Sequence, residues 1–362
     1  MLKRVARSII AGCCRFSGFV ASAEAQQIQR LTILTYHRIL PLEAKLRYFL
    51  PDLVVTPIAF ETHCRVLAKN YQVLPISEAV QGFLKNETSD KPLAAITFDD
   101  GYRDNVRYGL PILEKTGLSG TFFIISDLVG KEQIPWYDQL GRALYVLHSS
   151  SRWAEAVASI PDMNFQNFQK SVKQYELQAP RTPAGWVTWA KRLGQEERRQ
   201  WVEEFWKLAG LRESDIDPDD RIMSADEVKK LAACGHEIGS HSATHPILST
   251  LSDDELRREV QGSRTTLESL IGERVRSFCY PNGDHDDRVR RFTAEAEYKC
   301  AVTVAQGGNE RMADLFALRR WFIHEDRLAG FGGAPSATLF RMEISGLAER
   351  VFRRQGLKSN SG

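Results

Sequence analysis

The chain has 362 residues, of which 43% are hydrophobic and 26% are charged, so the composition excludes a disordered or fibrous protein. Lysine and arginine total 48 against 46 acidic residues, and this balance gives no electrostatic support for nucleic-acid binding. The length allows two ordinary domains or one large α/β barrel. The six cysteines show no Cys-x-x-Cys spacing and are expected to be free thiols, which favours a reducing compartment.

The N-terminal segment, residues 1–30, is basic and has two interpretations. Three basic residues precede a short apolar run, but Arg15 interrupts it before it reaches the roughly 7–15 residues of a signal-peptide core. We favour an amphipathic helix in a protein that is cytoplasmic or peripheral at the inner membrane, with this segment contacting the membrane surface. The alternative is export by a weak signal or as a lipoprotein, because Ile10–Cys13 resembles a lipoprotein cleavage box. No run has the roughly 18 apolar residues of a transmembrane span.

From residue 31 onward, short apolar runs alternate with amphipathic segments. The run Leu93–Phe98 is typical of a strand buried on both faces. Thr56 and Pro57 predict the start of a helix, and capping boxes at Ser224 and Ser252 predict two more. Strands are predicted at 31–36, 93–98, 120–125, 237–239, 277–280, 300–304 and 318–323. Repeated strand–helix–strand units predict a parallel sheet covered by helices.

Residues 131–222 interrupt this alternation. They contain six of the seven tryptophans, in segments that have the pattern of helices and loops. We favour a helical insertion that packs its aromatic rings against the flank of the barrel; the alternative is a lid over a sugar-binding groove. The rest is predicted to form a single domain over 31–345, with a helix end and a loose tail at 346–362.

Two adjacent carboxylates, Asp99 and Asp100, follow the predicted strand at 93–98. Successive residues of a strand point in opposite directions, so both can reach one site only if the chain turns, and Gly101 permits the turn. A metal ion bound by one carboxylate would keep the other ionised at neutral pH as a base. The alternative is a helix cap followed by a turn aspartate.

His241 and His245 follow another predicted strand. Residues four apart lie on one face of a helical turn, so both imidazoles can bind one cation. Two imidazoles and one carboxylate leave coordination positions open for water and substrate. A His-x-x-x-His pattern alone is weak, but together with the two aspartates it predicts a site for one divalent ion.

A third segment, Phe278–Asp284, contains a strand that ends in a Pro-Asn-Gly turn. The backbone amides of such a turn are candidates for stabilising a developing oxyanion. An ordinary turn with a side-chain cap is the alternative.

Together, these three segments resemble the polysaccharide deacetylase family, also called the NodB-homology family or carbohydrate esterase family 4. Its first motif, Thr-Phe-Asp-Asp-Gly, is complete at Thr97–Gly101, and its second is complete at His241–His245. The resemblance covers roughly residues 31–130 and 222–325. It implies a distorted, incomplete (β/α) barrel with seven strands, similar to a TIM barrel, and leaves the helical insertion outside.

The resemblance also implies a role for each matching residue. Asp99 is expected to be the general base. The divalent metal ion is expected to be held by Asp100, His241 and His245. Zn²⁺ is the default ion, and Co²⁺ or Ni²⁺ would also suit these nitrogen and oxygen ligands. Contacts to the substrate are expected from the residues beside the motifs, namely Tyr102, Tyr280, Pro281 and Gly283.

The third motif departs from the family pattern, which is typically Arg-x-Pro-Tyr-Gly. Cys279 stands where the arginine would be, and Asn282 stands where the tyrosine would be. The backbone amide near Asn282 is still a candidate for the oxyanion, because its position does not depend on the side chain. Arg320, in a segment similar to one in a branch of this family, is the candidate replacement for the arginine that orients the base.

The catalytic acid has two candidates. His37 lies in a Tyr-His segment similar to that of the circularly permuted poly-N-acetylglucosamine deacetylase branch, in which the first strand supplies the acid. His324 lies after the third motif, where most of the family has its acid, but no clean copy of that motif is present. We favour His37; its structural alternative is a buried histidine bonded to the backbone.

The resemblance implies metal-dependent removal of N-acetyl groups from the amino sugars of a polysaccharide or glycan precursor. A neutral glycan needs no basic groove, which agrees with a net charge of +2. Two alternatives stay open: a deformylase or amidase that acts on a small or lipid-linked sugar, and a relative that binds carbohydrate without catalysis. A phosphohydrolase is disfavoured, because its two carboxylates are usually two positions apart.

Overall fold

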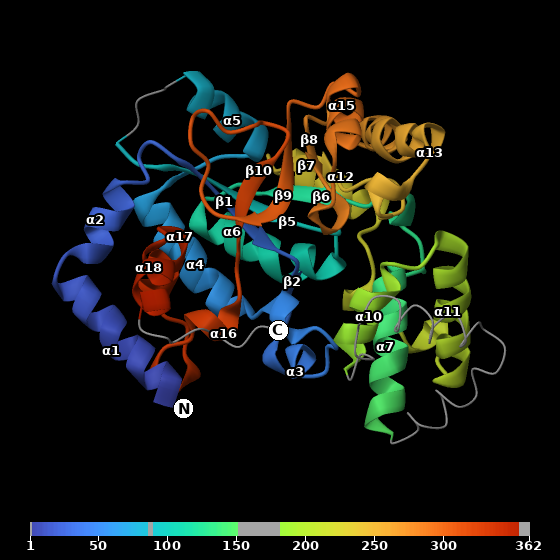
Figure 1. Cartoon of the computed structure of the whole chain (residues 1–362), viewed down its shortest axis with the longest axis horizontal. Coiled ribbons are helices and arrows are strands. Elements are labelled where there is room, and N and C mark those ends of the chain that lie inside the picture. Colours follow the sequence, from blue (N-terminus) through green and yellow to red (C-terminus); the bar gives the residue numbers. More distant parts are fainter. Residues whose placement is uncertain (1, 86–89, 151–181, 355–362) are drawn as a thin grey trace. The chain divides into compact units, whose positions relative to one another are not determined.

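The computed structural model of the chain describes residues 2–85, 90–150 and 182–354 (Figure 1). The chain separates into two compact units. The first contains Met1–Lys45, Asp52–Gly130 and Ile222–Gly362, and the second contains Leu46–Pro51 and Lys131–Arg221. The predicted tail at 355–362 and one tryptophan of the insertion, Trp153, lie outside the described residues.

A closed barrel of seven parallel strands forms the first unit, in the order β1-β10-β9-β8-β7-β6-β5, and the pairing of β1 with β5 completes the circle. The predicted seven-stranded (β/α) barrel is therefore confirmed. Its strands are β1 (Leu31–Tyr36), β5 (Leu93–Phe98), β6 (Thr121–Ile124), β7 (Glu237–Ser240), β8 (Ser277–Cys279), β9 (Cys300–Gln306) and β10 (Leu318–Phe322). The short strand β4 (Gln72–Val73) pairs with β5, and β2 (Arg38–Ile39) pairs with β3 (Val54–Val55) in a separate small sheet.

Helices of the first unit surround the strands (Figure 1). Helix α4 (Pro57–Asn70) begins after Thr56, whose hydroxyl accepts from the Ala59 amide, as the sequence predicts. The capping boxes at Ser224 and Ser252 are also present. The other helices of this unit are α1 (Leu2–Phe16), α2 (Phe19–Ala25), α3 (Leu42–Lys45), α5 (Ile76–Lys85), α6 (Leu110–Thr116), α12 (Ala225–Ala233), α15 (Asp287–Glu295), α16 (Glu325–Leu328), α17 (Ala337–Ile344) and α18 (Leu347–Arg354).

The helix predicted from Ser252 to Gly272 contains an irregularity. It consists of α13 (Asp253–Arg257), a π-helical turn at Arg258–Gly262 and α14 (Ser263–Ile271), and Gly272 ends it in the left-handed conformation. The π turn carries Glu259, which is buried. π-Helical turns often occur at functional sites, and this one adjoins the candidate site described below.

Alternate residues of the strands fill the inside of the barrel. The interior cluster contains Leu31 and Ile33 of β1, Ala95 of β5 and Val302 of β9, and α5 packs against it. A second apolar cluster lies between the strands and the helices. Because side chains alternate along a strand, the residues that continue the interior rows beyond the strand ends face the mouth of the barrel.

The second unit is helical and contains α7 (Trp136–Ser149), α10 (Pro183–Ala190) and α11 (Gln195–Leu208). Trp186, Trp189 and Trp201 are buried and pack on one another, with ring centroids 5.1–6.0 Å apart. The Arg198 guanidinium lies over the Trp136 ring. Trp186, Trp189 and Trp201 therefore contribute to a core within their own unit.

The N-terminal segment forms α1 and α2. Four large apolar side chains among the described residues of this segment are exposed: Ile9 (62%), Phe16 (92%), Phe19 (62%) and Ile28 (51%). Among the described residues, no helix has the length and hydropathy needed to cross a membrane. Contact of this segment with a membrane surface stays a prediction.

A buried histidine gives the barrel a measurable pH dependence. His63 of α4 is fully buried, stacks on Phe340 with ring centroids 4.2 Å apart, and shares a hydrogen bond with the Tyr36 hydroxyl. Burial lowers the pKa of His63 to about 3. The His63 imidazole takes up a proton near pH 6.5 in the unfolded chain but only near pH 3 in the folded chain. Acidification from pH 6.5 toward 3 therefore lowers the free energy of unfolding.

Replacing His63 with Gln should remove this contribution. Between pH 6.5 and 5, the wild type is expected to lose about 2 kcal/mol more unfolding free energy than His63→Gln. Urea denaturation at a series of pH values measures the difference, with the exposed His148→Gln as control. Parallel pH profiles for wild type and His63→Gln would contradict the assignment.

Candidate active site

The candidate site lies at the carboxyl ends of the barrel strands. Asp99 directly follows β5, His241 directly follows β7, and His37 directly follows β1. Cys279 ends β8, and Arg320 is on β10. These are the residues that continue the interior rows of their strands, and parallel α/β barrels place their active sites at this end. The structure thus brings segments far apart in the sequence to one place.

Asp99 is buried and forms a two-pronged ion pair with Arg320. Each carboxylate oxygen accepts from one terminal nitrogen of the guanidinium at 2.7 Å. Arg320 also donates to the Thr97 hydroxyl and the Thr303 carbonyl. Burial alone would raise the pKa of Asp99, but the Arg320 guanidinium holds it below its ordinary value. Asp99 is therefore an ionised and oriented carboxylate.

Asp100 points toward a different set of partners. Its backbone is left-handed, with φ 71°, and Gly101 follows with φ 79°, so the chain turns where the sequence predicts a turn. Its Oδ1 lies 3.5 Å from Nε2 of His241 and 3.7 Å from Nε2 of His245. Burial raises the pKa of Asp100, but the neighbouring imidazoles lower it more, so it too is ionised.

The two histidines lie close together, but the predicted helical turn between them is wrong. Residues 241–245 form a loop with positive φ at Ser242 (64°) and His245 (61°). The imidazole centroids are 4.8 Å apart. The loop is not helical because its amides have other acceptors: the His245 amide donates to the Ser242 hydroxyl, and two amides donate to Glu259.

Glu259 shapes this loop, a role that the sequence motifs do not predict. Its carboxylate accepts from the amides of Ala243 and Thr244 and from the Thr244 hydroxyl at 2.7–2.9 Å. A signal was present in the sequence: Glu259 falls between Leu256 and Val260 on the apolar side of its helix. An acidic residue in that position needs a buried partner.

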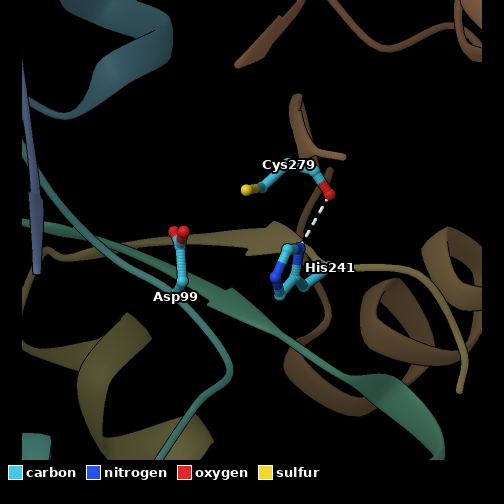
Figure 2. Close-up of side chains that lie close together, drawn as sticks. All are labelled: Asp99, His241 and Cys279. Atoms are coloured by element: carbon cyan, nitrogen blue, oxygen red, sulfur yellow. Dashed lines mark hydrogen bonds between the residues drawn. The ribbon is translucent and has the colours of Figure 1, made fainter. Parts of the chain in front are cut away.

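Atoms of Asp100, His241 and His245 suit a divalent ion. One ligand atom from each lies within 4.8 Å of the others, and all three residues are buried. His241 Nδ1 donates to the Cys279 carbonyl at 2.7 Å (Figure 2). Its Nε2, 3.5 Å from Asp100 Oδ1, is therefore the ring nitrogen available to an ion. Metal-binding histidines are typically oriented by such a hydrogen bond from the second ring nitrogen.

Cys279, which replaces the arginine of the family motif, contacts the arginine from β10. Its sulfur lies 3.3 Å from Nη2 of Arg320. Along β9 and β10 the register shifts between Leu318 and Arg320, which lie opposite Val302 and Gln306. The structure therefore places Arg320 against Asp99, as a replacement for the missing arginine would require.

His37 is the histidine that approaches Asp99. Its Nε2 lies 3.8 Å from Asp99 Oδ2, and its side chain is 17% exposed. Asn105 donates to the His37 carbonyl at 2.9 Å and so ties the segment to the motif loop. Burial lowers the pKa of His37, although Asp99 and Asp100 act in the opposite direction. The rings of His37 and His324 both contact the Phe322 ring, and burial lowers the pKa of His324 to about 4.

The residues around the motifs differ in exposure. Tyr102 and Tyr280 are fully buried: the Arg38 guanidinium covers the first ring, and the second hydroxyl donates to the Phe316 carbonyl. Neither ring faces solvent as a sugar-stacking ring would. Pro281 is buried. Gly283 is half-buried, and its amide donates a hydrogen bond to the Tyr280 carbonyl.

Asn282 occupies the turn after β8 with φ 56°. The backbone amides two residues before and after it have acceptors: the Tyr280 amide donates to the Val302 carbonyl, and the Asp284 amide donates to the Pro281 carbonyl. In the described part of the chain, Asn282 Nδ2 is buried without a hydrogen-bond partner. A buried donor of this kind is costly unless a ligand satisfies it.

Comparison with known proteins identifies the family. A model described as polysaccharide deacetylase matches residues 86–175 and 194–301, more than half of the chain. The chain therefore belongs to the polysaccharide deacetylase family, as the sequence motifs predict. It is 34% identical over 262 residues to a protein named putative polysaccharide deacetylase YxkH of Bacillus subtilis, covering 72% of this chain and 62% of that protein. The chain thus spans less than two thirds of that relative.

Solved structures share the fold. The deacetylase PplD of Streptococcus pyogenes, in complex with acetate, is 17% identical with a TM-score of 0.56, covering 87% of this chain and 98% of that one. IcaB of Ammonifex degensii is 15% identical with a TM-score of 0.51, covering 82% and 93%. At these identities the likeness concerns the fold alone.

Removing the arginine tests how far the site depends on it. Arg320→Met is expected to lower the unfolding free energy by about 3–5 kcal/mol, because Asp99 would be left buried without its partner. Arg319→Met, on the same strand with an exposed side chain, is the control and should stay within about 0.5 kcal/mol of wild type. Chemical denaturation measures both. Equal stabilities of the two variants would show that Asp99 does not need Arg320.

Proposed function

We propose that the protein is a metal-dependent deacetylase that removes N-acetyl groups from amino sugars of a polysaccharide or glycan precursor. The observation that supports this proposal most strongly is that the two adjacent carboxylates have different partners. Asp99 lies on the Arg320 guanidinium, whereas Asp100 lies against the imidazoles of His241 and His245. One carboxylate is thus arranged for proton transfer and the other for metal binding.

Asp100, His241 and His245 would hold the ion, and this donor set suits Zn²⁺, Co²⁺ or Ni²⁺. When bound, a divalent ion supplies Lewis acidity, which acidifies a water molecule and polarises an amide carbonyl. The Cys279 carbonyl holds the His241 ring in place, and Glu259 holds the loop that carries both histidines. The ligands are therefore oriented before an ion arrives.

Asp99 is the proposed base. It is ionised and fixed in direction by Arg320, so that it can accept the proton of the attacking water. His37 Nε2, 3.8 Å from the Asp99 carboxylate, is placed to pass a proton to the leaving amine. Proton acceptance and proton donation thus occur on neighbouring groups at one end of the barrel.

The turn at Asn282 is the proposed oxyanion contact. The residue before it, Pro281, has no N–H, and the amide of the residue after it, Gly283, already donates to the Tyr280 carbonyl. The unpartnered side-chain amide of Asn282 adds a second donor at the same place. Donors that are fixed before the reaction stabilise developing negative charge effectively.

Asp99→Asn tests the base. The amide keeps the size of the side chain but cannot accept the proton, so the rate of acetate release from N-acetylated chito-oligosaccharides should fall about 10²–10⁴-fold. The zinc-loaded proteins are compared, with Asp127→Asn, an exposed aspartate after β6, as control. Full activity of Asp99→Asn would refute the assignment. Faster release of formate from N-formylated oligosaccharides than of acetate from the N-acetylated ones would indicate a deformylase.

Two histidine variants distinguish the candidate acids. Because His37 lies beside Asp99, His37→Gln should lower the rate of acetate release about 10²–10⁴-fold, whereas His324→Gln should lower it by less than about tenfold. Both rates are measured at saturating substrate on zinc-loaded protein. The opposite ranking of the two variants would assign the acid to His324.

A further inference from the structure

A second set of metal-binding groups overlaps the proposed catalytic site. Asp99, His241 and Cys279 each offer one ligand atom, and these atoms lie within 4.8 Å of one another. Figure 2 shows the Asp99 carboxylate, the His241 ring and the Cys279 thiol bordering a common space. All three residues are buried. This set differs from the first because it contains a sulfur.

We propose that Asp99, His241 and Cys279 form a second cation site that takes thiophilic divalent ions, represented by Cd²⁺. Thiolate ligands select soft ions, whereas the first set offers only nitrogen and oxygen.

Two carboxylates and one guanidinium lie around this second set of ligands. The Asp99 carboxylate is paired with Arg320, whereas the Asp100 carboxylate lies beside His241, the ligand that the two sets share. Cys279 is a free cysteine in the structure. Binding forms the sulfur–metal bond and releases the thiol proton to solvent.

The two sites cannot be filled independently, because they share His241. Its Nδ1 is held by the Cys279 carbonyl, so a single ring nitrogen remains for either ion. An ion in the second site would also bind Asp99, the proposed base. The second site therefore makes the protein sensitive to thiophilic metals, in a way that an arginine at position 279 would not allow.

Cd²⁺ titration of the full chain tests this site without an activity assay. The three thiols that reach solvent, Cys13, Cys14 and Cys234, are first replaced with Ser. Cd²⁺ should then produce a saturable sulfur-to-cadmium charge-transfer absorption in the ultraviolet. Cys279→Ser should abolish this absorption, and Cys300→Ser, at another buried cysteine of the barrel interior, should retain it.

The histidines separate the two sites. His245→Gln removes a ligand of the first set only and should keep the charge-transfer band, whereas His241→Gln should abolish it. Circular dichroism checks that each variant is folded, and His241→Gln provides the test if Cys279→Ser does not fold. A band that survives Cys279→Ser or His241→Gln, or no band in the starting protein, would overturn the proposal. None of these outcomes depends on deacetylation.

Discussion

The ion pair between Asp99 and Arg320 is the interaction on which the site depends. Two adjacent buried carboxylates would repel each other and take up a proton if nothing compensated them. The guanidinium compensates Asp99 through two hydrogen bonds, which leaves Asp100 to the imidazoles of His241 and His245. The positive φ at Asp100 makes the separation possible, because it turns the second carboxylate away from the first.

The closed barrel supplies the geometry for this arrangement. Asp99 and Arg320 are 221 positions apart in the chain, yet they meet because both continue interior rows of their strands. The pairing of β1 with both β5 and β10 brings His37 to the same mouth. The surrounding helices contribute as well, since Glu259 from the π-helical turn fixes the histidine loop.

Much of this arrangement could be predicted from the sequence. Apolar runs located the seven strands to within two residues, and the aspartates and histidines at their ends gave the family and the candidate ligands. The conformation of residues 241–245 could not be predicted, because spacing alone does not reveal that Glu259 competes for the loop amides. The contacts of Tyr102 and Tyr280 could not be predicted from the sequence either, because burial of an aromatic ring depends on tertiary packing.

The central claim is that the two adjacent aspartates have different functions in deacetylation, with Asp100 a ligand of the catalytic ion and Asp99 the base. Isothermal titration of Zn²⁺ into folded Asp100→Asn and Asp99→Asn proteins tests it most directly. The account predicts that Asp99→Asn binds Zn²⁺ with nearly the affinity of the wild type, and that Asp100→Asn loses most of that affinity. Retention of zinc by Asp100→Asn together with its loss in Asp99→Asn would contradict the account.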